Sequence, residues 1–441
     1  MISIRSLFIL VGLLASQTCL ANPDIQHWQM NNGTRVFFVE LHELPMVDLQ
    51  VIFDAGSARD KTQNGLAMLT SSLIAEGAAG LDANTISRNF EAHGANFSTN
   101  AGYDSASVSL RSLSDKKHLK PALVNLKRIL TSPDFPESAI ERQRNRMLIG
   151  IKYKQQSPDD LADDAFTAAL YGNHPYAFPR EGTANSLQQL TRGDIRGFYQ
   201  KYYVAANAML VMVGDLDRDE AESLAAELMN GLKTGNQAEA LPDVKPLKSP
   251  QSIKINHPSA QTHILVGQPG IRRGDPDYFP LYVGNQILGG GAMVSRLFEE
   301  VREKRGLSYA VYSYFSPMRR EGPFTAGLQT KNGQAQQALE VMNKELEKFI
   351  EHGPTEEELN AAKKNITGGF PLNLNSNSKI ANYVAMIGYY GLPMDYLDTF
   401  NDNINKVTVA EIKGAFKRRL TPENFVTVMV GNLEQGDGEN N

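Results

Sequence analysis

The sequence has very little cysteine: Cys19, near the amino terminus, is the one cysteine in 441 residues. A single cysteine excludes an intrachain disulfide, a cysteine-rich zinc site and an iron–sulfur cluster. The chain has no surplus of positive charge either, since its net charge is −5. We therefore expect no nucleic-acid binding, because a phosphate backbone needs a basic surface. No apolar run after the amino-terminal region reaches the roughly 18 residues of a membrane span, so we expect none.

Residues 1–21 have the pattern of a secretory signal peptide. Arg5 supplies a lone positive charge, an apolar run covers 7–15, and small residues lead to Ala21. The predicted cleavage site follows Ala21. We therefore expect a periplasmic or secreted protein, and the lack of disulfides favours a bacterial periplasm. A lipid anchor on Cys19 is the alternative, which the residues just before the cysteine disfavour.

Two segments of the sequence repeat each other. Residues 191–216 read TRGDIRGFYQKYYVAANAMLVMVGDL, and residues 408–433 read TVAEIKGAFKRRLTPENFVTVMVGNL. They align without a gap, and both show a helical pattern followed by a short apolar run that ends in glycine. Identity of this density over one helix and one strand makes chance a poor explanation. The repeat predicts a chain of two homologous halves.

The repeat also sets the domain boundaries that we predict. Residues 22–235 form the amino-terminal half, and residues 252–433 form the carboxy-terminal half. The stretch between them, 236–251, is rich in proline and poor in large apolar residues, which is typical of an extended linker. The acidic tail, 434–441, is predicted to be disordered.

The pattern of each half predicts an α+β fold. Pairs of strands followed by runs of helices favour an antiparallel-rich sheet with helices packed on one face. In the first half the expected strands cover 34–40, 47–53, 96–100 and 105–113, and the expected helices cover 65–76, 83–93, 116–130 and 136–156. In the second half the expected strands cover 262–266, 308–315 and 323–328, and the expected helices cover 278–288 and 334–352. Asn64 is the predicted cap of the first helix.

Several segments resemble one enzyme family. They are the opening stretch 31–60, the segment NGLAMLTSSLIAEG at 64–77, and the strand pair GANFSTNAGYDSASVSL at 94–110. LGGGAMVSRLFEEVREKRGLSYAVYSYF, at 288–315, closely resembles the same family's carboxy-terminal signature. In order and spacing, nearly the whole mature chain is similar to the pitrilysin and mitochondrial-processing-peptidase family of zinc metallopeptidases, of the inverzincin type.

The resemblance breaks down at the metal site. The family binds zinc through His-x-x-Glu-His on a helix, where two histidines hold the metal and the glutamate activates the bound water. Here the motif falls on Met68, Ser71 and Ser72. The family's remaining ligand, a glutamate on a later helix, falls near Ile149 or Gly150. The resemblance therefore implies a degenerate zinc site and no cofactor in this chain.

No other residues replace the lost ligands. The histidines are scattered, and no two of them are spaced by three or four residues. Glu76, one turn beyond the lost motif, is expected to be a solvated charge at a helix end. An active enzyme with relocated metal ligands is therefore the least supported of the functions considered.

The family's second catalytic element is retained. It is an arginine and a tyrosine seven residues apart, which the resemblance places at Arg302 and Tyr309. In the family both side chains hydrogen-bond the substrate carbonyl, and fixed donors there stabilise the negative charge that develops during hydrolysis. A helix ending near Lys304, a turn at Gly306 and a strand from Ser308 would bring the pair to one site. In isolation, Arg302 is typical of a solvated helix face, and Tyr309 is typical of a half-buried strand.

Two further segments are candidate substrate-binding elements. Gly289, Gly290 and Gly291 follow an apolar helix, at the place where the non-catalytic subunit of the mitochondrial processing peptidase carries a longer glycine-rich loop that contacts substrate. No phosphate-loop sequence follows them, and a helix C-cap with a tight turn is the alternative interpretation. The strand from Asn96 to Asn100 resembles the family's edge strand, which pairs with an extended peptide.

Two principal hypotheses follow for a chain that is inactive alone. The first is a non-metal-binding subunit of a periplasmic heteromeric zinc peptidase. Arg302 and Tyr309 would then act in trans on peptide substrates, and a sister subunit would carry the zinc and hydrolyse the peptide. The second is a non-catalytic peptide-binding or scaffold protein of the same fold. The retained pair beside a lost metal site favours the first hypothesis.

Overall fold

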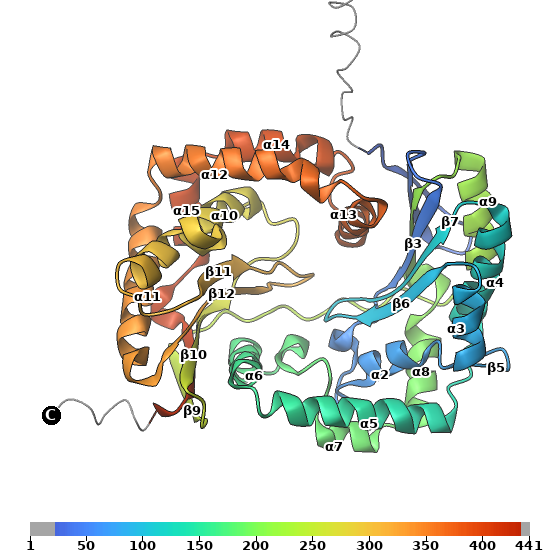
Figure 1. Ribbon diagram of the computed structural model, residues 1–441, viewed down its shortest axis with the longest axis horizontal. Helices are drawn as coiled ribbons and strands as arrows, with labels where there is room; N and C mark the ends of the chain where they lie inside the picture. Colours follow the sequence, from blue (N-terminus) through green and yellow to red (C-terminus); the bar gives the residue numbers. More distant parts are fainter. Residues whose placement is uncertain (1–22, 434–441) are drawn as a thin grey trace, which may run out of the picture.

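The computed structural model describes residues 23–433, in which two large β-sheets lie on opposite sides of the molecule (Figure 1). A two-stranded sheet of β4 (Gly77–Ala78) and β5 (Leu81–Asp82) accompanies them. The predicted signal peptide, with Cys19 and Ala21, and the predicted disordered tail lie outside the described residues. Within 23–433, none of the helices is both long enough and apolar enough to cross a bilayer.

A six-stranded sheet forms the centre of the amino-terminal half. Its strand order is β1 (Gln26–Gln29), β2 (Arg35–Glu40), β8 (Ala208–Gly214), β3 (Met46–Phe53), β7 (Ala106–Leu113) and β6 (Asn96–Ala101). The strand of the internal repeat, β8, is buried along its whole length, parallel to β2 and antiparallel to β3. Burial on both faces explains why its sequence is one apolar run without alternation.

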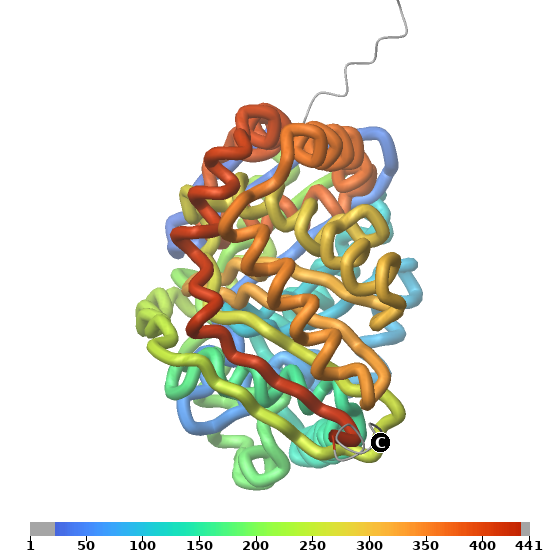
Figure 2. Tube along the Cα trace, turned by 90° about the vertical axis from the view of Figure 1, so that its left-hand side faces the viewer, coloured from blue at the N-terminus to red at the C-terminus, as the bar shows by residue number. Residues whose placement is uncertain are grey.

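A five-stranded sheet forms the centre of the carboxy-terminal half. Its order is β11 (Val311–Phe315), β12 (Pro323–Lys331), β10 (Gln261–Pro269), β13 (Val426–Gly431) and β9 (Gln251–Asn256). The second repeat strand, β13, again has one parallel neighbour, β9, and one antiparallel neighbour, β10. Figure 2 shows β9 and β13 side by side near the end of the chain. The two repeat strands therefore occupy equivalent places in the two sheets.

Helices from the same half lie over one face of each sheet, some directly on the strands and others on the first layer of helices. In the amino-terminal half they are α2 (Leu66–Leu73), α3 (Ala83–Glu91), α4 (Lys116–Thr131), α5 (Glu137–Lys154), α7 (Ala184–Gln189), α8 (Arg192–Tyr202) and α9 (Arg218–Met229). In the carboxy-terminal half they are α10 (Tyr278–Asn285), α11 (Ala335–His352), α12 (Glu356–Gly369), α14 (Tyr396–Lys406) and α15 (Val409–Arg419). The α+β prediction, with antiparallel-rich sheets and helices on one face, is confirmed.

The helices of the internal repeat begin with the same local device. Thr191 caps α8 by accepting a hydrogen bond from the backbone N–H of Asp194, and the Asp194 carboxylate accepts one from the backbone of Thr191. Thr408 and Glu411 form the same reciprocal pair at the start of α15. This capping box satisfies N–H groups that have no partner inside the helix. The shared Thr-x-x-Asp/Glu spacing of the two segments therefore has a structural cause.

The remaining face of each sheet is covered by a helix from the other half. Helix α6 (Pro158–Tyr171) packs on β10 and β13, and helix α13 (Asn377–Tyr390) packs on β3 and β8 (Figure 1). Contact at α13 is close, because a Cβ atom at Gly388 would lie 2.7 Å from both Met209 Sδ and Phe37 Cε2. The guanidinium of Arg35 also donates a hydrogen bond to the Gly388 carbonyl, at 2.7 Å. The two halves are thus interlocked.

A buried carboxylate joins the segments that meet between the halves. Asp104, in the turn between β6 and β7, accepts hydrogen bonds from the hydroxyl of Tyr176 at 2.5 Å and from that of Tyr390 at 3.0 Å. It also accepts one from the backbone N–H of Arg319 at 2.8 Å, and its own carbonyl accepts one from the Tyr389 hydroxyl. Three partners satisfy a carboxylate that is only 5% exposed.

The segment between the two sheets is extended but not wholly exposed. Residues 233–248 contain no helix or strand. Leu241 is buried beside α6, and its carbonyl accepts hydrogen bonds from the guanidinium of Arg320. The carbonyl of Pro242 contacts the ring of His174 at 3.0 Å. The segment therefore forms part of the contact between the halves.

We expect Gly388→Ala to weaken the seat of α13 on the amino-terminal sheet. The added methyl group must displace Met209 and Phe37, and such overpacking costs about 1–3 kcal/mol. Gly368→Ala, in α12, is the matched control because a Cβ atom there meets nothing within 4 Å. Both changes gain the same helix propensity, so the difference between the two variants isolates the packing term. Urea denaturation measures the free energy of unfolding of both variants. Equal stabilities would contradict the close packing of α13 on the amino-terminal sheet.

Candidate functional site

The helix that carries the degenerate metal motif begins at a buried carboxylate. Asn64 was the predicted cap, and this prediction is wrong: α2 starts after Gly65, in the left-handed region at φ 93°, with no cap from Asn64. Asp60 takes that role, and its two oxygens accept hydrogen bonds from the backbone N–H groups of Gly65 and Ala67, each at 2.8 Å. Asp60 is only 4% exposed, and this burial raises the pKa of its carboxyl group to about 8.

The positions of the metal motif on α2 carry no metal ligand. Met68 is partly buried and packs against the helical core, Ser71 is buried, and the hydroxyl of Ser72 donates to the Leu69 carbonyl at 2.8 Å. Thioether and hydroxyl groups in this pattern do not match the imidazoles and carboxylate that a zinc peptidase needs. The residues therefore do not fit a zinc ion. Within residues 23–433 there is also no cluster of three histidine, cysteine, aspartate or glutamate side chains that could hold a metal.

The expected third ligand position on α5 is equally unsuited to zinc. Ile149 is 55% exposed, and Gly150 lines a cavity of about 540 Å³. Glu76, expected to be a solvated charge, is instead bound to α5: its carboxylate accepts from the guanidinium of Arg142 at 2.8 Å and from the amide of Gln143 at 2.5 Å. This carboxylate therefore holds the end of α2 against α5.

The structure brings Arg302 and Tyr309 into contact. The guanidinium of Arg302 lies 4.6 Å from the centre of the Tyr309 ring, and its Nη1 donates to the Tyr309 backbone carbonyl at 3.0 Å. The intervening chain turns at Gly306, whose φ is 62°, after a π-helical segment, η6 (Phe298–Glu303), capped by Lys304. The strand expected from Ser308 begins three residues later, at Val311, as β11.

Tyr309 is unusually open for a large aromatic residue. It is 79% exposed, so the half-buried packing expected for an isolated strand tyrosine is wrong. Its hydroxyl forms no hydrogen bond with any described residue, whereas the guanidinium of Arg302 is held by the ring and carbonyl of Tyr309 and the ring of Phe298. The tyrosine hydroxyl is therefore free to bind an acceptor from outside the chain.

The glycine run has a packing role that its sequence did not indicate. Gly289 and Gly290 end a π-helical segment, η4 (Gln286–Gly290), and Gly291 is its C-cap, so the interpretation of the glycine run as a helix C-cap is confirmed. A Cβ atom at Gly289 would lie 2.4 Å from the backbone nitrogen of Ser313 on β11. The glycines thus let the chain pack tightly on the sheet edge. The next residues, Met293 and Val294, are 75% and 83% exposed.

Both sheets end in a strand with a free edge. β6 is the last strand of its sheet and pairs with β7 only, and β11 has the same place in the other sheet. On β6 the side chains of Asn96 and Asn100 are exposed, while their alternate neighbours turn inward. An edge of this kind leaves backbone N–H and C=O groups available for pairing with an extended peptide.

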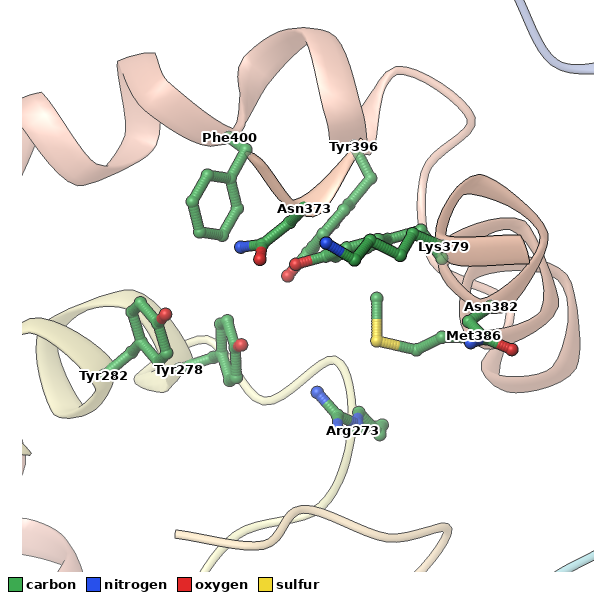
Figure 3. A pocket seen from close by; sticks show the side chains of 10 residues that line it. Arg273, Tyr278, Tyr282, Asn373, Lys379, Asn382, Met386, Tyr396 and Phe400 are labelled. Carbon is green, nitrogen blue, oxygen red and sulfur yellow. The ribbon is translucent and has the colours of Figure 1, made fainter. Parts of the chain in front are cut away.

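One cavity was missed by the sequence reasoning. It lies between α10, α13 and α14, has a volume of about 370 Å³, and is lined by several tyrosines together with Arg273 and Lys379 (Figure 3). The tyrosines come from α10 and, about a hundred residues later, from the consecutive helices α13 and α14. Tyr278 and Tyr282 have helical spacing, which alone indicates only one apolar face. No local signal connects them with Arg273 or Lys379.

The purified chain alone is expected to carry no stoichiometric zinc and to show no chelator-sensitive peptidase activity. The reason is the absence of ligands at Met68, Ser71 and Ser72. The measurement is elemental analysis of untagged protein after incubation with zinc and desalting. About one tightly held zinc per chain would show that a metal site has been built from other residues.

The stability of α2 is expected to depend on pH through Asp60. The folded pKa of about 8 lies above the unfolded value, so the folded chain retains a proton that the unfolded chain loses. The resulting stability is fully present below about pH 4 and is lost as the pH rises through about 8. Asp60→Asn keeps a neutral side chain of similar shape. The stability of the parent relative to this variant should therefore fall between pH 5 and pH 9 in urea denaturation, and an unchanged difference over this range would show that Asp60 is already ionised in the folded chain.

Comparisons with known proteins bear on this arrangement. The pattern described as "Insulinase (Peptidase family M16)" matches residues 35–184, and that described as "Peptidase M16 inactive domain" matches residues 189–366. A solved structure from Pseudomonas fluorescens, titled a peptidase M16 inactive domain, is 39% identical with a TM-score of 0.90, covering 92% of this chain and 98% of that one.

Two curated relatives have similar lengths. "Non-peptidase homolog YmxG" of Helicobacter pylori is 28% identical over 97% of this chain and 99% of its own length. "Uncharacterized zinc protease YmxG" of Bacillus subtilis is 25% identical over 92% of this chain and 98% of its own length. The matches cover both halves of the chain, and they agree with the resemblance of the individual sequence segments. The chain belongs to peptidase family M16, in a form without the family's metal-binding motif.

Proposed function

We propose that this chain is the non-metal-binding subunit of a heteromeric zinc peptidase. It supplies substrate binding and carbonyl stabilisation in trans, and a zinc-bearing sister subunit of the same family hydrolyses the peptide. The observation that carries the proposal is the free hydroxyl of Tyr309, exposed beside Arg302 in a chain whose residues 23–433 contain no cluster of metal ligands.

The chemistry of the pair supports this role. A peptide carbonyl becomes negatively charged as water adds to it, and fixed N–H and O–H donors stabilise that charge. The contact between the Arg302 guanidinium and the Tyr309 ring holds the two donors near each other before substrate arrives. A cation next to the ring also favours donation by the tyrosine hydroxyl to an anionic oxygen. No step of this kind requires a metal in this chain.

The neighbouring elements support substrate binding. β6, with Asn96 and Asn100, offers a strand edge to which an extended peptide can add through main-chain hydrogen bonds, which tolerate many sequences. The Gly289–Gly291 segment fixes the base of the loop that exposes Met293 and Val294. These apolar side chains are suited to contact with a substrate or with the sister subunit.

A specific observation favours the second candidate, a peptide-binding or scaffold protein without catalysis. Arg302 already donates to the backbone carbonyl of Tyr309, so it must change partners before it can bind a substrate carbonyl. In a purely structural role this contact would simply close the turn at Gly306. The two candidates differ in what the tyrosine hydroxyl contributes to turnover.

We place the complex in the bacterial periplasm, on the basis of the signal pattern at residues 1–21 and the lack of cysteine after Cys19. Zinc belongs to the partner in this proposal. An apolar, exposed loop in a chain with a free sheet edge is consistent with a permanent partner that covers them.

Tyr309→Phe is expected to lower turnover of the reconstituted complex by about 10²–10³, the usual effect of removing one oxyanion donor. The change removes only a hydroxyl from a side chain that is 79% exposed, so folding and assembly should not change. Tyr153→Phe, on α5, is the matched control because Tyr153 is 70% exposed and lies outside this segment. Steady-state cleavage is measured on complexes whose assembly is verified by gel filtration.

The outcome separates the two candidates. If Tyr309→Phe assembles normally and turns over within about threefold of the parent, the hydroxyl contributes under ~1 kcal/mol to the barrier. The pair is then structural, and the scaffold candidate replaces the proposal. If no sister chain with an intact metal motif co-purifies from the cell envelope, the heteromeric role itself is wrong.

A further inference from the structure

The cavity between α10, α13 and α14 carries an excess of positive charge. Its volume is about 370 Å³, and its charged lining side chains, Arg273 and Lys379, are both cationic. Figure 3 shows Arg273 on one side of this space and Lys379 and Tyr396 on the other, with Met386 between them. Neither Arg302 nor Tyr309 lines it, so the cavity is separate from the site discussed above.

A second cavity of about 270 Å³ shares Arg273, Tyr278 and Tyr396 with the first. Asp275 is the one carboxylate on its lining, but Asp275 is buried and accepts a hydrogen bond from the guanidinium of Arg419 at 2.8 Å. Its charge is therefore already compensated. Neither lining supplies a free anion to balance Arg273 and Lys379.

The guanidinium of Arg273 has no anionic partner among the described residues. It lies near the rings of Tyr278 and Tyr390, at 5.9 and 5.8 Å, and its Nε is buried without a hydrogen-bond partner. By contrast, Arg59 is paired with the carboxylate of Asp54 through two hydrogen bonds at 2.8 Å. A partly buried guanidinium without an acceptor is costly, and an anionic ligand would remove that cost.

The polar groups around Arg273 are donors suited to an anion. Lys379 gives one hydrogen bond to the Leu372 carbonyl, which leaves further N–H donors. Burial raises the pKa of the Tyr383 and Tyr396 hydroxyls, although the positive charge of Arg273 acts on both in the opposite direction. Both hydroxyls remain protonated at neutral pH, and they already interact with neighbouring side chains, Tyr396 with Tyr278 and Tyr383 with Asn373.

The rest of the lining consists of the amide side chains of Asn373 and Asn382 and of aromatic or apolar groups. Tyr278 and Tyr282 stack with ring centres 5.7 Å apart and planes inclined by 18°, and Phe400 and Met386 complete the wall. A flat hydrophobic group fits such a surface. The volume lies within the range of ordinary ligand pockets, about 300–1,000 Å³.

We propose that this cavity binds a carboxylate attached to an aromatic or other apolar group, with Arg273 as the main anchor and Lys379 as a second cation. A guanidinium pairs with a planar carboxylate through two parallel hydrogen bonds, and one such anion offsets part of the positive charge of Arg273 and Lys379. The shared chemistry is that of a small aromatic acid or of a peptide chain that ends in an aromatic residue. The inference does not depend on the proposed catalytic partnership.

Isothermal titration of the full mature chain, without any partner, tests this directly. The probes are N-acetyl-phenylalanine and its amide, which differ only in the charged group. We expect the acid to bind at least tenfold more tightly than the amide, and acetate and inorganic phosphate to bind more weakly than the acid. Equal binding of acid and amide, or phosphate binding as tight as that of the acid, would overturn the proposal.

Arg273→Gln should abolish the preference for the acid. Arg272→Gln is the matched control, because Arg272 is the exposed neighbour and makes only backbone contacts. Lys379→Gln, at an exposed position on α13, should reduce the preference without affecting folding and serves if Arg273→Gln does not fold. If Arg273→Gln and Lys379→Gln both retain the parent's preference for the acid, these cations do not bind the carboxylate and the proposal is wrong.

A tetrapeptide that ends in phenylalanine distinguishes the two sources of carboxylate. Tighter binding than N-acetyl-phenylalanine, lost when the terminus is amidated, identifies a peptide terminus as the ligand. Weaker binding of the peptide identifies a small free acid. Either result supports a carboxylate site. If neither N-acetyl-phenylalanine nor the tetrapeptide with a free carboxy terminus binds, the proposal is wrong.

Discussion

Each sheet of this protein has two apolar faces, but its own half supplies helices for only one of them. On the amino-terminal sheet, Phe37, Met209 and Val211 face away from the helices of their half and would be exposed in an isolated domain. Helix α13 of the other half covers them, and α6 covers the equivalent face of the second sheet. Since burial of apolar area is the main stabilising term, neither half can be stable in this form alone. The two homologous halves are one folding unit, and Asp104 fixes the seam between them through Tyr176, Tyr390 and Arg319.

This constraint positions the candidate site. The free edges of β6 and β11 belong to different sheets, and their relative placement is set by the exchanged helices and by the hydrogen bonds of Asp104. The cavity with Arg273 and Lys379 depends on the same exchange, because α13 contributes Lys379 and Met386 to it while Asn382 accepts a hydrogen bond from Gln50 on the opposite sheet. A ligand in that cavity would therefore contact the helix that joins the halves.

Local signals predicted most of the individual elements, and tertiary contacts decided the rest. The apolar run at 208–214 and the alternation along 106–113 indicate strands because burial sets their periodicity. Nothing in the sequence of α13 tells which sheet it covers, since its apolar face fits either. The cap at Asp60 was missed because this carboxylate comes from a preceding turn and lies outside the usual cap position. Likewise, the close contact of Gly289 with Ser313 on β11 was missed because it joins residues that are distant in the sequence.

Packing explains the residues at the lost metal site, but it does not explain the exposed tyrosine of the Arg302–Tyr309 pair. On α2, buried Leu66, Leu69 and Leu73 hold the helix in the core, so the helix keeps its place without metal. Met68 and Ser71 pack there with no charge to bury, and their identity is explained by stability alone. The same explanation does not extend to Tyr309, which is 79% exposed and has a hydroxyl without a partner among the described residues. An exposed aromatic ring held beside a guanidinium adds little to the core. Its place in this segment is better explained by what it can bind than by what it stabilises.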